Sequence, residues 1–246
     1  MTQRDEIIKH LNNYLSISEF KDYGPQGLQV EGKNEVQKIV TGVSASAQFF
    51  AQAADHGADM IIVHHGILWD RETPIIKGGY KQRVLTLLQN DMTLVAYHLP
   101  LDKHPDIGNN ALAVKALGLE DIKDFAEVGY MGSIPPCSFD VLLKKIQDLY
   151  QSDPLVFAYG PERIERIGIC SGGAQRAITE AIDHQLDAFI TGEVSEPTMH
   201  VAKEGNIHFI SAGHYATERL GIRALGEHVA GQFDVEVEFI DIPNPV

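Results

Sequence analysis

The clearest structural signal in the sequence is the stretch Asp59-Met60-Ile61-Ile62-Val63-His64-His65-Gly66. An apolar run that ends abruptly at polar residues and a glycine predicts a buried β-strand. Side chains of a regular strand alternate between its faces, so His64 and His65 can share one cleft only where the strand gives way to a loop. Neutral imidazole is a good ligand for transition metals. The pair alone fits a metal site about as well as it fits one structural and one solvated histidine.

Predicted strands and helices alternate along the rest of the chain. Amphipathic or capped segments predict helices at residues 3–15, 47–54, 82–89, 109–117, 139–150, 174–182 and 219–229. Apolar runs predict strands at residues 28–30, 38–43, 59–66, 92–97, 126–130, 167–171, 188–194 and 209–214. Ser44 or Ser46 is expected to cap the second helix, and Pro135-Pro136 is expected to break the chain after residue 130. This alternation predicts an α/β fold with mixed or parallel sheets and flanking helices.

The second half of the chain repeats the order of motifs in the first. The strands at 39–44, 60–66 and 94–98 correspond in order to those at 167–171, 188–194 and 209–214. We therefore predict an internal duplication with two similar lobes, residues 1–125 and 126–246, intertwined in one structural unit. Ligands of such sheets gather at the carboxyl ends of strands, which predicts a metal site in the cleft between the lobes.

Histidines and acids lie at those carboxyl ends. His98 is followed four residues later by Asp102, and His214 is followed four residues later by Glu218. This spacing places both ligands on one side of a helix, which suits residues 214–218. Pro100 disfavours a helix in the other segment, so Asp102 is expected to reach the site from a loop.

Imidazole and carboxylate donors without thiolate suit Zn, Mn, Fe, Co or Ni and disfavour Cu(I) or iron–sulfur clusters. The donors suffice for two divalent ions, which a carboxylate can bridge. Cys137 and Cys170 are the only cysteines, too few for a disulfide framework or a thiolate cage. Cys170 is expected to be buried and inert. The cysteine count fits a reducing cytoplasm, where we expect the protein to reside.

The chain has 246 residues, 44% of them hydrophobic, and a formal charge of −14. An acidic chain of this kind is poorly suited to hold nucleic acid or anionic membranes, so nucleic acid is an improbable partner, although a local basic patch is compatible with the total charge. No apolar run approaches the length of a membrane span, and residues 1–6 carry no signal-peptide pattern. We expect a small-molecule substrate and no membrane association.

The motifs together resemble the YbgI-like proteins, also described as GTP cyclohydrolase I type 2 homologues, in their short bacterial form. The resemblance extends over essentially the whole chain. It rests on Gln26-Gly27-Leu28-Gln29-Val30, His64-His65-Gly66, His98-Leu99-Pro100-Leu101-Asp102, Thr191-Gly192-Glu193 and Gly213-His214-Tyr215-Ala216-Thr217-Glu218. It implies a dinuclear metal centre and a toroidal homohexamer, a trimer of dimers. The ligands that it implies are His64, His65, Asp102, His214 and Glu218.

The leading functional hypothesis is a metal-dependent hydrolase that acts on a nucleotide or a related small molecule, as the family's name suggests. Glu193 and His98 are candidate catalytic residues that transfer a proton, or else they orient metal ligands. The alternative is a non-enzymatic, toroidal metal-binding protein with a regulatory or nucleic-acid-associated role, and a metal carrier is a third possibility.

Two weaker signals concern substrate recognition. Cys170-Ser171-Gly172-Gly173-Ala174 resembles a phosphate cradle but lacks the lysine of a P-loop, and tight packing of a turn explains its glycines better. Trp69 and Tyr215 flank ligand motifs and could stack on a base, although packing is the commoner role of such aromatic residues.

Overall fold

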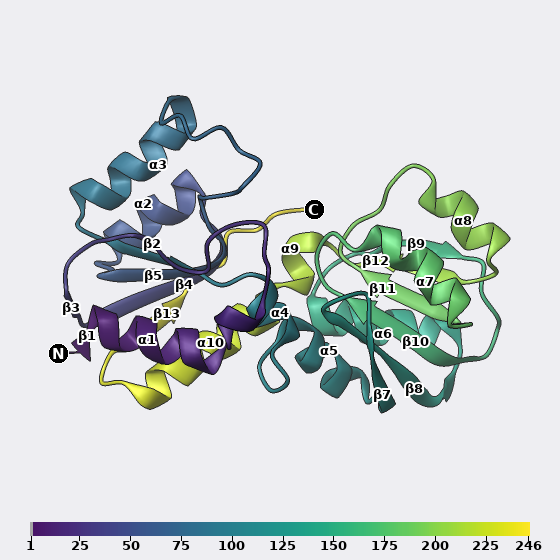
Figure 1. Ribbon diagram of the computed structural model, residues 1–246. Coiled ribbons are helices and arrows are strands. Elements are labelled where there is room, and N and C mark those ends of the chain that lie inside the picture. The colour runs from purple at the N-terminus through teal and green to yellow at the C-terminus, as the bar shows by residue number, and fades with distance from the viewer. Residues whose placement is uncertain (1) are drawn as a thin grey trace. The chain divides into compact units, whose positions relative to one another are not determined.

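A computed structural model of the protein describes residues 2–246 (Figure 1). The chain forms two compact units. Unit 1 combines the chain up to His104 with Gly221–Ile242, and unit 2 combines Pro105–Leu220 with Pro243–Val246. The compact units do not follow a division at residue 125, because the last helix and strand return to unit 1. The two lobes 1–125 and 126–246 stay a prediction about the duplicated halves.

The sheet of unit 1 has five strands in the order β13-β4-β5-β6-β2. The four strands from β13 to β6 are parallel, and β2 is antiparallel to β6. Their bounds are β2 Gly27–Val30, β4 Lys38–Ser44, β5 Met60–His65, β6 Thr93–Ala96 and β13 Glu236–Phe239. A separate two-stranded sheet pairs β1 (Thr2–Gln3) with β3 (Glu35–Val36). All ligand motifs of this unit follow the carboxyl ends of its parallel strands.

Helices cover both faces of this sheet (Figure 1). One face carries α1 (Arg4–Tyr14) and α10 (Arg219–Gln232), and the other carries α2 (Ala47–Asp55) and α3 (Gly78–Gln89). The core beneath α2 and α3 is apolar throughout, and Phe49, Phe50 and Leu87 are fully buried in it. Ser46 caps α2, because its hydroxyl accepts the N–H of Phe49 at 3.1 Å, as one of the two sequence alternatives predicted.

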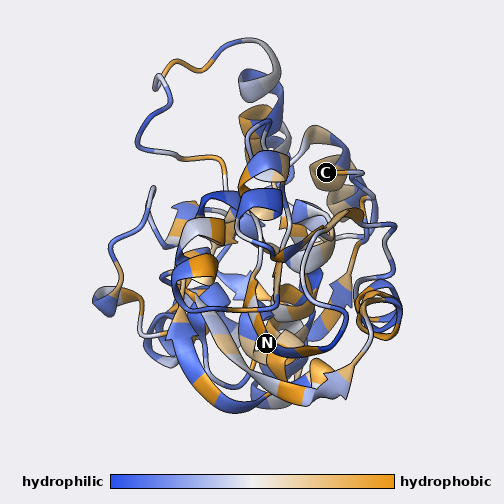
Figure 2. Cartoon of the chain, turned by 90° about the vertical axis from the view of Figure 1, so that its right-hand side faces the viewer, coloured by the Kyte–Doolittle hydropathy of each residue, from blue (hydrophilic) through white to orange (hydrophobic). Residues whose placement is uncertain are grey.

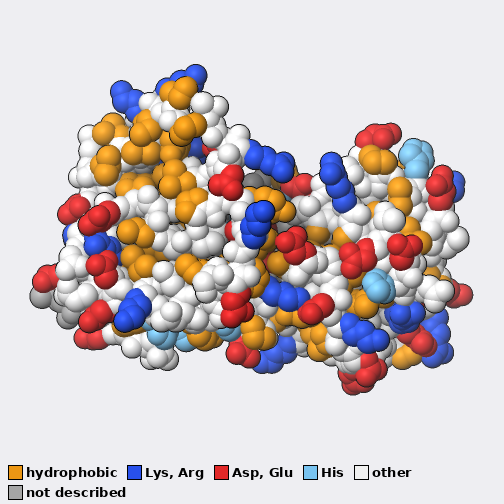
Figure 3. Space-filling model, viewed as in Figure 1, with side chains coloured by type: hydrophobic (Ala, Val, Ile, Leu, Met, Phe, Trp, Pro, Cys, Tyr) orange, Lys and Arg blue, Asp and Glu red, His pale blue; other side chains and the backbone are white. Residues whose placement is uncertain are grey.

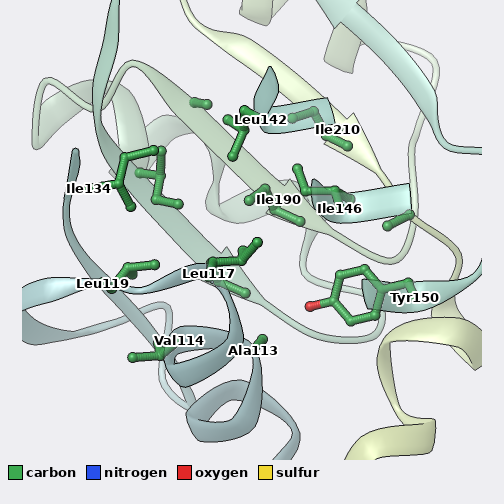
Figure 4. Packing of buried hydrophobic residues seen from close by; sticks show 14 of the residues in the cluster. Ala113, Val114, Leu117, Leu119, Ile134, Leu142, Ile146, Tyr150, Ile190 and Ile210 are labelled. Carbon is green, nitrogen blue, oxygen red and sulfur yellow. The ribbon is translucent and has the colours of Figure 1, made fainter. Parts of the chain in front are cut away.

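The sheet of unit 2 has six strands in the order β7-β8-β10-β11-β12-β9. The strands are β7 Glu120–Phe125, β8 Gly129–Cys137, β9 Leu155–Ala158, β10 Ile164–Cys170, β11 Ala188–Thr191 and β12 His208–Ser211. Helices α5 (Asn109–Leu117) and α6 (Phe139–Tyr150) contribute Leu117 and Ile146 to the core that Figure 4 shows. Figure 2 shows helices and strands that carry both hydrophilic and hydrophobic residues. The remaining helical segments are η1 Ile17–Glu19, α4 Leu99–Lys103, η2 Gln175–Ala177, α7 Ile178–Asp183, α8 Thr198–Glu204 and α9 His214–Thr217.

The two units share a duplicated arrangement of strands. In each unit three consecutive strands are parallel, β4-β5-β6 in one and β10-β11-β12 in the other, and an antiparallel strand lies beside the third. A carboxylate repeats as well: Asp59 accepts the backbone N–H groups of residues 37 and 38, and Asp187 accepts those of residues 165 and 166. The predicted α/β fold with two similar lobes is confirmed.

The prediction for residues 126–137 was right for residues 129 and 130, which begin β8, and wrong for residues 126–128 and for the break at the prolines. Residues 126–128 form a turn, with φ of 48° at Ala126 and 65° at Glu127, and strand β8 continues through Pro135 and Pro136. The pairing of β8 with β10 is irregular there, because Ser133 pairs with Arg166 whereas Cys137 pairs with Ile164. The prolines occupy this bulge, where the ladder needs no N–H donor. None of the helices within residues 2–246 is long and apolar enough to cross a membrane.

We predict that Asp59→Asn lowers the free energy of unfolding by about 1–3 kcal/mol at neutral pH. Burial raises the pKa of the Asp59 carboxyl, yet bonds from Lys33 and from the N–H groups of Gln37 and Lys38 outweigh burial and lower that pKa. A lowered pKa in the folded state gives stability that is present above the ordinary carboxyl pKa and is lost as pH falls through the folded value.

Urea denaturation of wild type and Asp59→Asn at neutral and acid pH measures this difference, which should shrink at acid pH. The exposed Asp55→Asn is the control and should change the unfolding free energy little at either pH. An Asp59→Asn effect that stays constant as pH falls would contradict the assigned role of the carboxylate.

Candidate metal centre

Three histidine rings gather at the carboxyl ends of β5 and β6 in unit 1. His64 and His65 are the last two residues of β5, and His98 immediately precedes α4. The ring centroids lie 4.7 Å apart for His64 and His65, 5.1 Å for His64 and His98, and 5.5 Å for His65 and His98. One nitrogen of each ring lies within 4.8 Å of the others, so these rings could hold one metal ion.

Each of these rings is held through its Nδ1 atom. The carbonyl oxygen of Tyr97 lies 2.9 Å from Nδ1 of His64. Since a carbonyl only accepts, Nδ1 carries the hydrogen and Nε2 keeps its lone pair in the neutral ring. Nδ1 of His65 lies 3.3 Å from the hydroxyl oxygen of Ser44 on the neighbouring strand. These contacts at Nδ1 fix the direction of Nε2, the nitrogen that would ligate a metal ion.

His98 is held by a carboxylate that the sequence analysis missed. Oδ1 of Asp22 lies 2.8 Å from Nδ1 of His98, and Oδ2 accepts the N–H of Leu99 at 2.9 Å. Burial raises the pKa of Asp22, but bonds from His98 and from the N–H groups of Tyr23 and Leu99 outweigh it and lower that pKa. Asp22 therefore stays ionised and fixes the orientation of the imidazole. Asp22 opens a turn-rich segment, which is only a weak sequence signal for this role.

Asp102 lies on a helix, and the prediction that it reaches the site from a loop was wrong. Helix α4 spans Leu99–Lys103, and the N–H of Asp102 donates to the carbonyl of His98 at 3.1 Å. Pro100 is compatible with this helix because it lies in the first turn, where a backbone N–H needs no helical partner. The helix brings Oδ2 of Asp102 to 3.6 Å from Nε2 of His64.

Unit 2 carries its own set of donors at the carboxyl ends of β11 and β12. Nε2 of His214 lies 3.1 Å from Oε1 of Glu218, so the four-residue spacing does bring these residues together. Oε1 of Glu193 lies 2.7 Å from Nδ1 of His214. Glu193 is held in turn, since its Oε2 accepts from Nε2 of Gln175 at 3.1 Å. The side-chain contacts from Gln175 through Glu193 to His214, and from His214 to Glu218, fix the His214 ring at both nitrogens.

These contacts change the protonation of His214. Burial lowers its pKa, but hydrogen bonds and charge from Glu218 and Glu193 outweigh burial and raise the pKa to about 9. In the absence of a metal ion the imidazole is therefore protonated at neutral pH. The proton occupies the position between Nε2 and the Glu218 carboxylate where a cation would bind.

The glycine-rich turn after β10 packs against these donors. Gly172 has a φ of +67°, and a Cβ at this position would collide with Oε1 of Glu218. The N–H of Gly172 donates to the hydroxyl of Thr217 at 3.0 Å, and that of Ser171 donates to the side-chain oxygen of Asn110 at 2.8 Å. Because side chains already use these N–H groups, close packing accounts for the turn better than a phosphate cradle does.

The other singled-out residues differ in exposure. Trp69 is half-buried, and its ring lies 6.1 Å from that of His65. Tyr215 is buried, and its N–H donates to the carbonyl of Val246 at 2.9 Å. Cys170 is also buried, as expected. Only Trp69 of these three remains a candidate for contact with a substrate.

The donors fit a transition metal. Unit 1 supplies three histidines and unit 2 supplies one, each with its Nδ1 held, and each unit has a carboxylate oxygen near a histidine Nε2. This combination of imidazole and carboxylate suits Zn, Mn, Fe, Co or Ni.

Comparison with known proteins agrees with these motifs. Residues 2–245 match the family model described as Duf34/NIF3 (NGG1p interacting factor 3). The chain belongs to the Duf34/NIF3 family. Among its relatives is a protein named GTP cyclohydrolase 1 type 2 homolog from Haemophilus influenzae, 46% identical, with 98% of each chain covered.

Solved structures of Duf34/NIF3 relatives share the fold. The structure described as protein ybgI, unknown function, is 45% identical and superposes with a TM-score of 0.95 over 100% of both chains. A protein of known structure from Thermus thermophilus is 34% identical, with a TM-score of 0.93 over 100% of both chains. The predicted family resemblance is confirmed.

We predict that metal binding to the metal-free protein at pH 7 to 8 releases a proton from His214. The raised pKa of about 9 means that the ring is protonated before the ion binds at Nε2 and neutral afterwards. Proton release should therefore fade as pH rises through about 9, and apparent affinity should increase as pH rises toward that value.

Calorimetric Zn²⁺ titrations in buffers of different ionisation enthalpy measure the number of protons released. Glu193→Gln is the comparison variant, because removing one carboxylate lowers the pKa of His214 and should reduce the release at pH 8. Equal release by both proteins would show that another group supplies the proton.

Proposed function

We propose that this protein is a metal-dependent hydrolase in which His64, His65, Asp102, His214 and Glu218 hold two divalent metal ions. The observation that carries the proposal is the hydrogen bonding of the histidine rings at Nδ1. In His64, His65 and His214 the Nδ1 atom is bonded to a group of the same unit, which fixes the direction in which Nε2 points. Metal-ligating histidines are commonly fixed in this way.

Each unit offers its own set of proposed ligands. Unit 1 offers nitrogens of His64 and His65 with the Asp102 carboxylate, and unit 2 offers His214 with Glu218. Duplicated strands end at both sets, so the two sets hold equivalent places in their units. Two divalent cations bound together would lower the pKa of a bound water and polarise the bond that it attacks.

His98 and Glu193 have different roles in this proposal. His98 is held at Nδ1 by the ionised Asp22, so its Nε2 can accept a proton from a reacting group and return it. Glu193 is bonded to Nδ1 of His214 and to Gln175, which makes it a positioning residue for the ligand. Asp22 is likewise a positioning residue, because it holds the ring of His98 at Nδ1.

A nucleotide or a related small molecule is the proposed substrate. The support is the name GTP cyclohydrolase 1 type 2 homolog that relatives 45–46% identical to this chain carry. A regulatory role on nucleic acid has less support. The net charge is −14, and acidic and basic side chains are interspersed on the face that Figure 3 shows.

We predict about two metal ions per chain in protein purified without added metal, and loss of at least one in His64→Ala and in Glu218→Ala. Elemental analysis measures the content, and circular dichroism checks that both variants stay folded. His200→Ala is the matched control, because His200 is exposed on α8 and should leave the content unchanged.

The metal-loaded proteins are then screened for hydrolysis of GTP, other nucleotides, phosphodiesters and dipeptides. Turnover that Glu218→Ala loses and His200→Ala keeps supports the enzyme and names its substrate class. Full metal content in Glu218→Ala would refute the ligand assignment, and two ions without turnover would favour the non-enzymatic alternative.

We also propose that the chain assembles into the homohexamer that the resemblance implies. Three apolar side chains on α3 and the loop before it are unusually exposed: Ile75 at 53%, Ile76 at 59% and Leu88 at 59%. Large apolar residues exposed in one segment can mark contacts between protein chains. Figure 3 shows apolar side chains gathered over this region of unit 1.

Sedimentation velocity should give a hexamer for wild type and smaller species for the double variant Ile76→Lys, Leu88→Lys. Leu155→Lys on β9 is the control for adding one charge at an exposed apolar position, and it should leave the hexamer intact. A monomeric wild type would refute the assembly, and a hexameric double variant would exclude this surface.

A further inference from the structure

Two aromatic side chains flank the imidazole of His98 in unit 1. The ring of Tyr23 lies 6.1 Å from that of His98, and the ring of Trp69 lies 5.4 Å from it and perpendicular to it. Tyr23 and Trp69 are named the aromatic rim below. The rim thus borders the histidine that is proposed to move a proton.

Main-chain contacts hold the rim in place. The N–H of Tyr23 donates to Oδ1 of Asp22 at 2.6 Å, and its carbonyl accepts the N–H of Asp70 at 2.8 Å. The indole N–H of Trp69 donates to the carbonyl of Gly66 at 3.2 Å. Segments 22–24 and 66–70 therefore lie against each other. The backbone of Tyr23 and the indole of Trp69 are thus held before a ligand binds, which lowers the cost of ordering them.

Packing does not account for the position of Tyr23. Its side chain is 51% exposed, so the ring contributes little to the core. An exposed aromatic ring beside a polar cluster offers a flat apolar face with a polar tip. Rings of this kind bind other planar rings by offset or edge-to-face stacking, largely irrespective of the pattern of polar groups on the ligand.

We propose that the aromatic rim binds a planar heteroaromatic ring of the substrate beside His98. This inference rests on the proposed function and narrows it, because it makes the substrate a heteroaromatic compound rather than a simple ester or peptide. Stacking on Tyr23 and Trp69 would place the ring within reach of the His98 imidazole, which could then exchange a proton with a ring atom or its substituent. The phenol and indole do not enter the reaction.

The single tryptophan of the sequence makes the rim directly observable. Trp69 is the only tryptophan, so all tryptophan fluorescence of the protein comes from the proposed binding surface. We would titrate the metal-containing protein with guanosine and, separately, with ribose, which lacks the aromatic ring. Excitation at the red edge of the indole absorption avoids absorption by guanosine. We expect saturable quenching with guanosine and none with ribose.

The position of the ligand is tested with two variants of Tyr23. Tyr23→Leu removes the aromatic face and should raise the dissociation constant of guanosine about tenfold, the effect expected for loss of one stacking contact. Tyr23→Phe keeps the face and should bind guanosine as wild type does. Elemental analysis should give the same metal content for both variants, because Tyr23 contacts Asp22 only through its backbone.

The outcomes separate this inference from the proposed function. Absence of quenching by guanosine, or equal binding by Tyr23→Leu and wild type, overturns the aromatic rim even where metal content and hydrolysis of a non-aromatic substrate are found. Quenching that Tyr23→Leu weakens and Tyr23→Phe preserves supports the rim, and it does so even where the metal content contradicts the hydrolase.

Discussion

A hydrogen bond at one nitrogen of an imidazole ring fixes the direction of the other, and the four histidines of the candidate metal centre, His64, His65, His98 and His214, have such a bond. The acceptor for His64 is the carbonyl of Tyr97, which the sheet of unit 1 fixes rigidly. His98 and His214 use carboxylates, Asp22 and Glu193, instead. A carboxylate acceptor makes the ring more basic, which is consistent with the raised pKa of His214.

The duplicated units hold corresponding histidines with carboxylates from different positions. Both place a histidine after the third parallel strand and an acid four residues later, yet the carboxylates that hold these histidines come from unrelated positions. Asp22 precedes β2, whereas Glu193 follows β11, where unit 1 has the end of β5. Duplication therefore preserved the ring that faces the site and allowed the group behind it to change.

Local patterns predicted the parts of the protein in which neighbouring residues decide the structure. The apolar run before His64 specifies β5, and the spacing of His214 and Glu218 brought them together as expected. Asp22 was missed because it meets His98 only after β2 has paired with β6, and no local signal reports that pairing. The predictions made from Pro100 and Pro135 were wrong for the same reason. Neither a first helical turn nor a bulge needs the backbone N–H that proline lacks, so both sites tolerate proline.

The assignment of the last strand to unit 1 has a consequence for the order of folding. Strand β13 pairs with β4 near the opposite end of the sequence, and all of unit 2 except its last four residues lies between them in the chain. During synthesis nearly all of unit 2 emerges while β4 still has an open edge. Open edges of apolar strands attract other chains. Nascent or truncated chains that end before residue 236 therefore expose an aggregation-prone edge that the full chain covers.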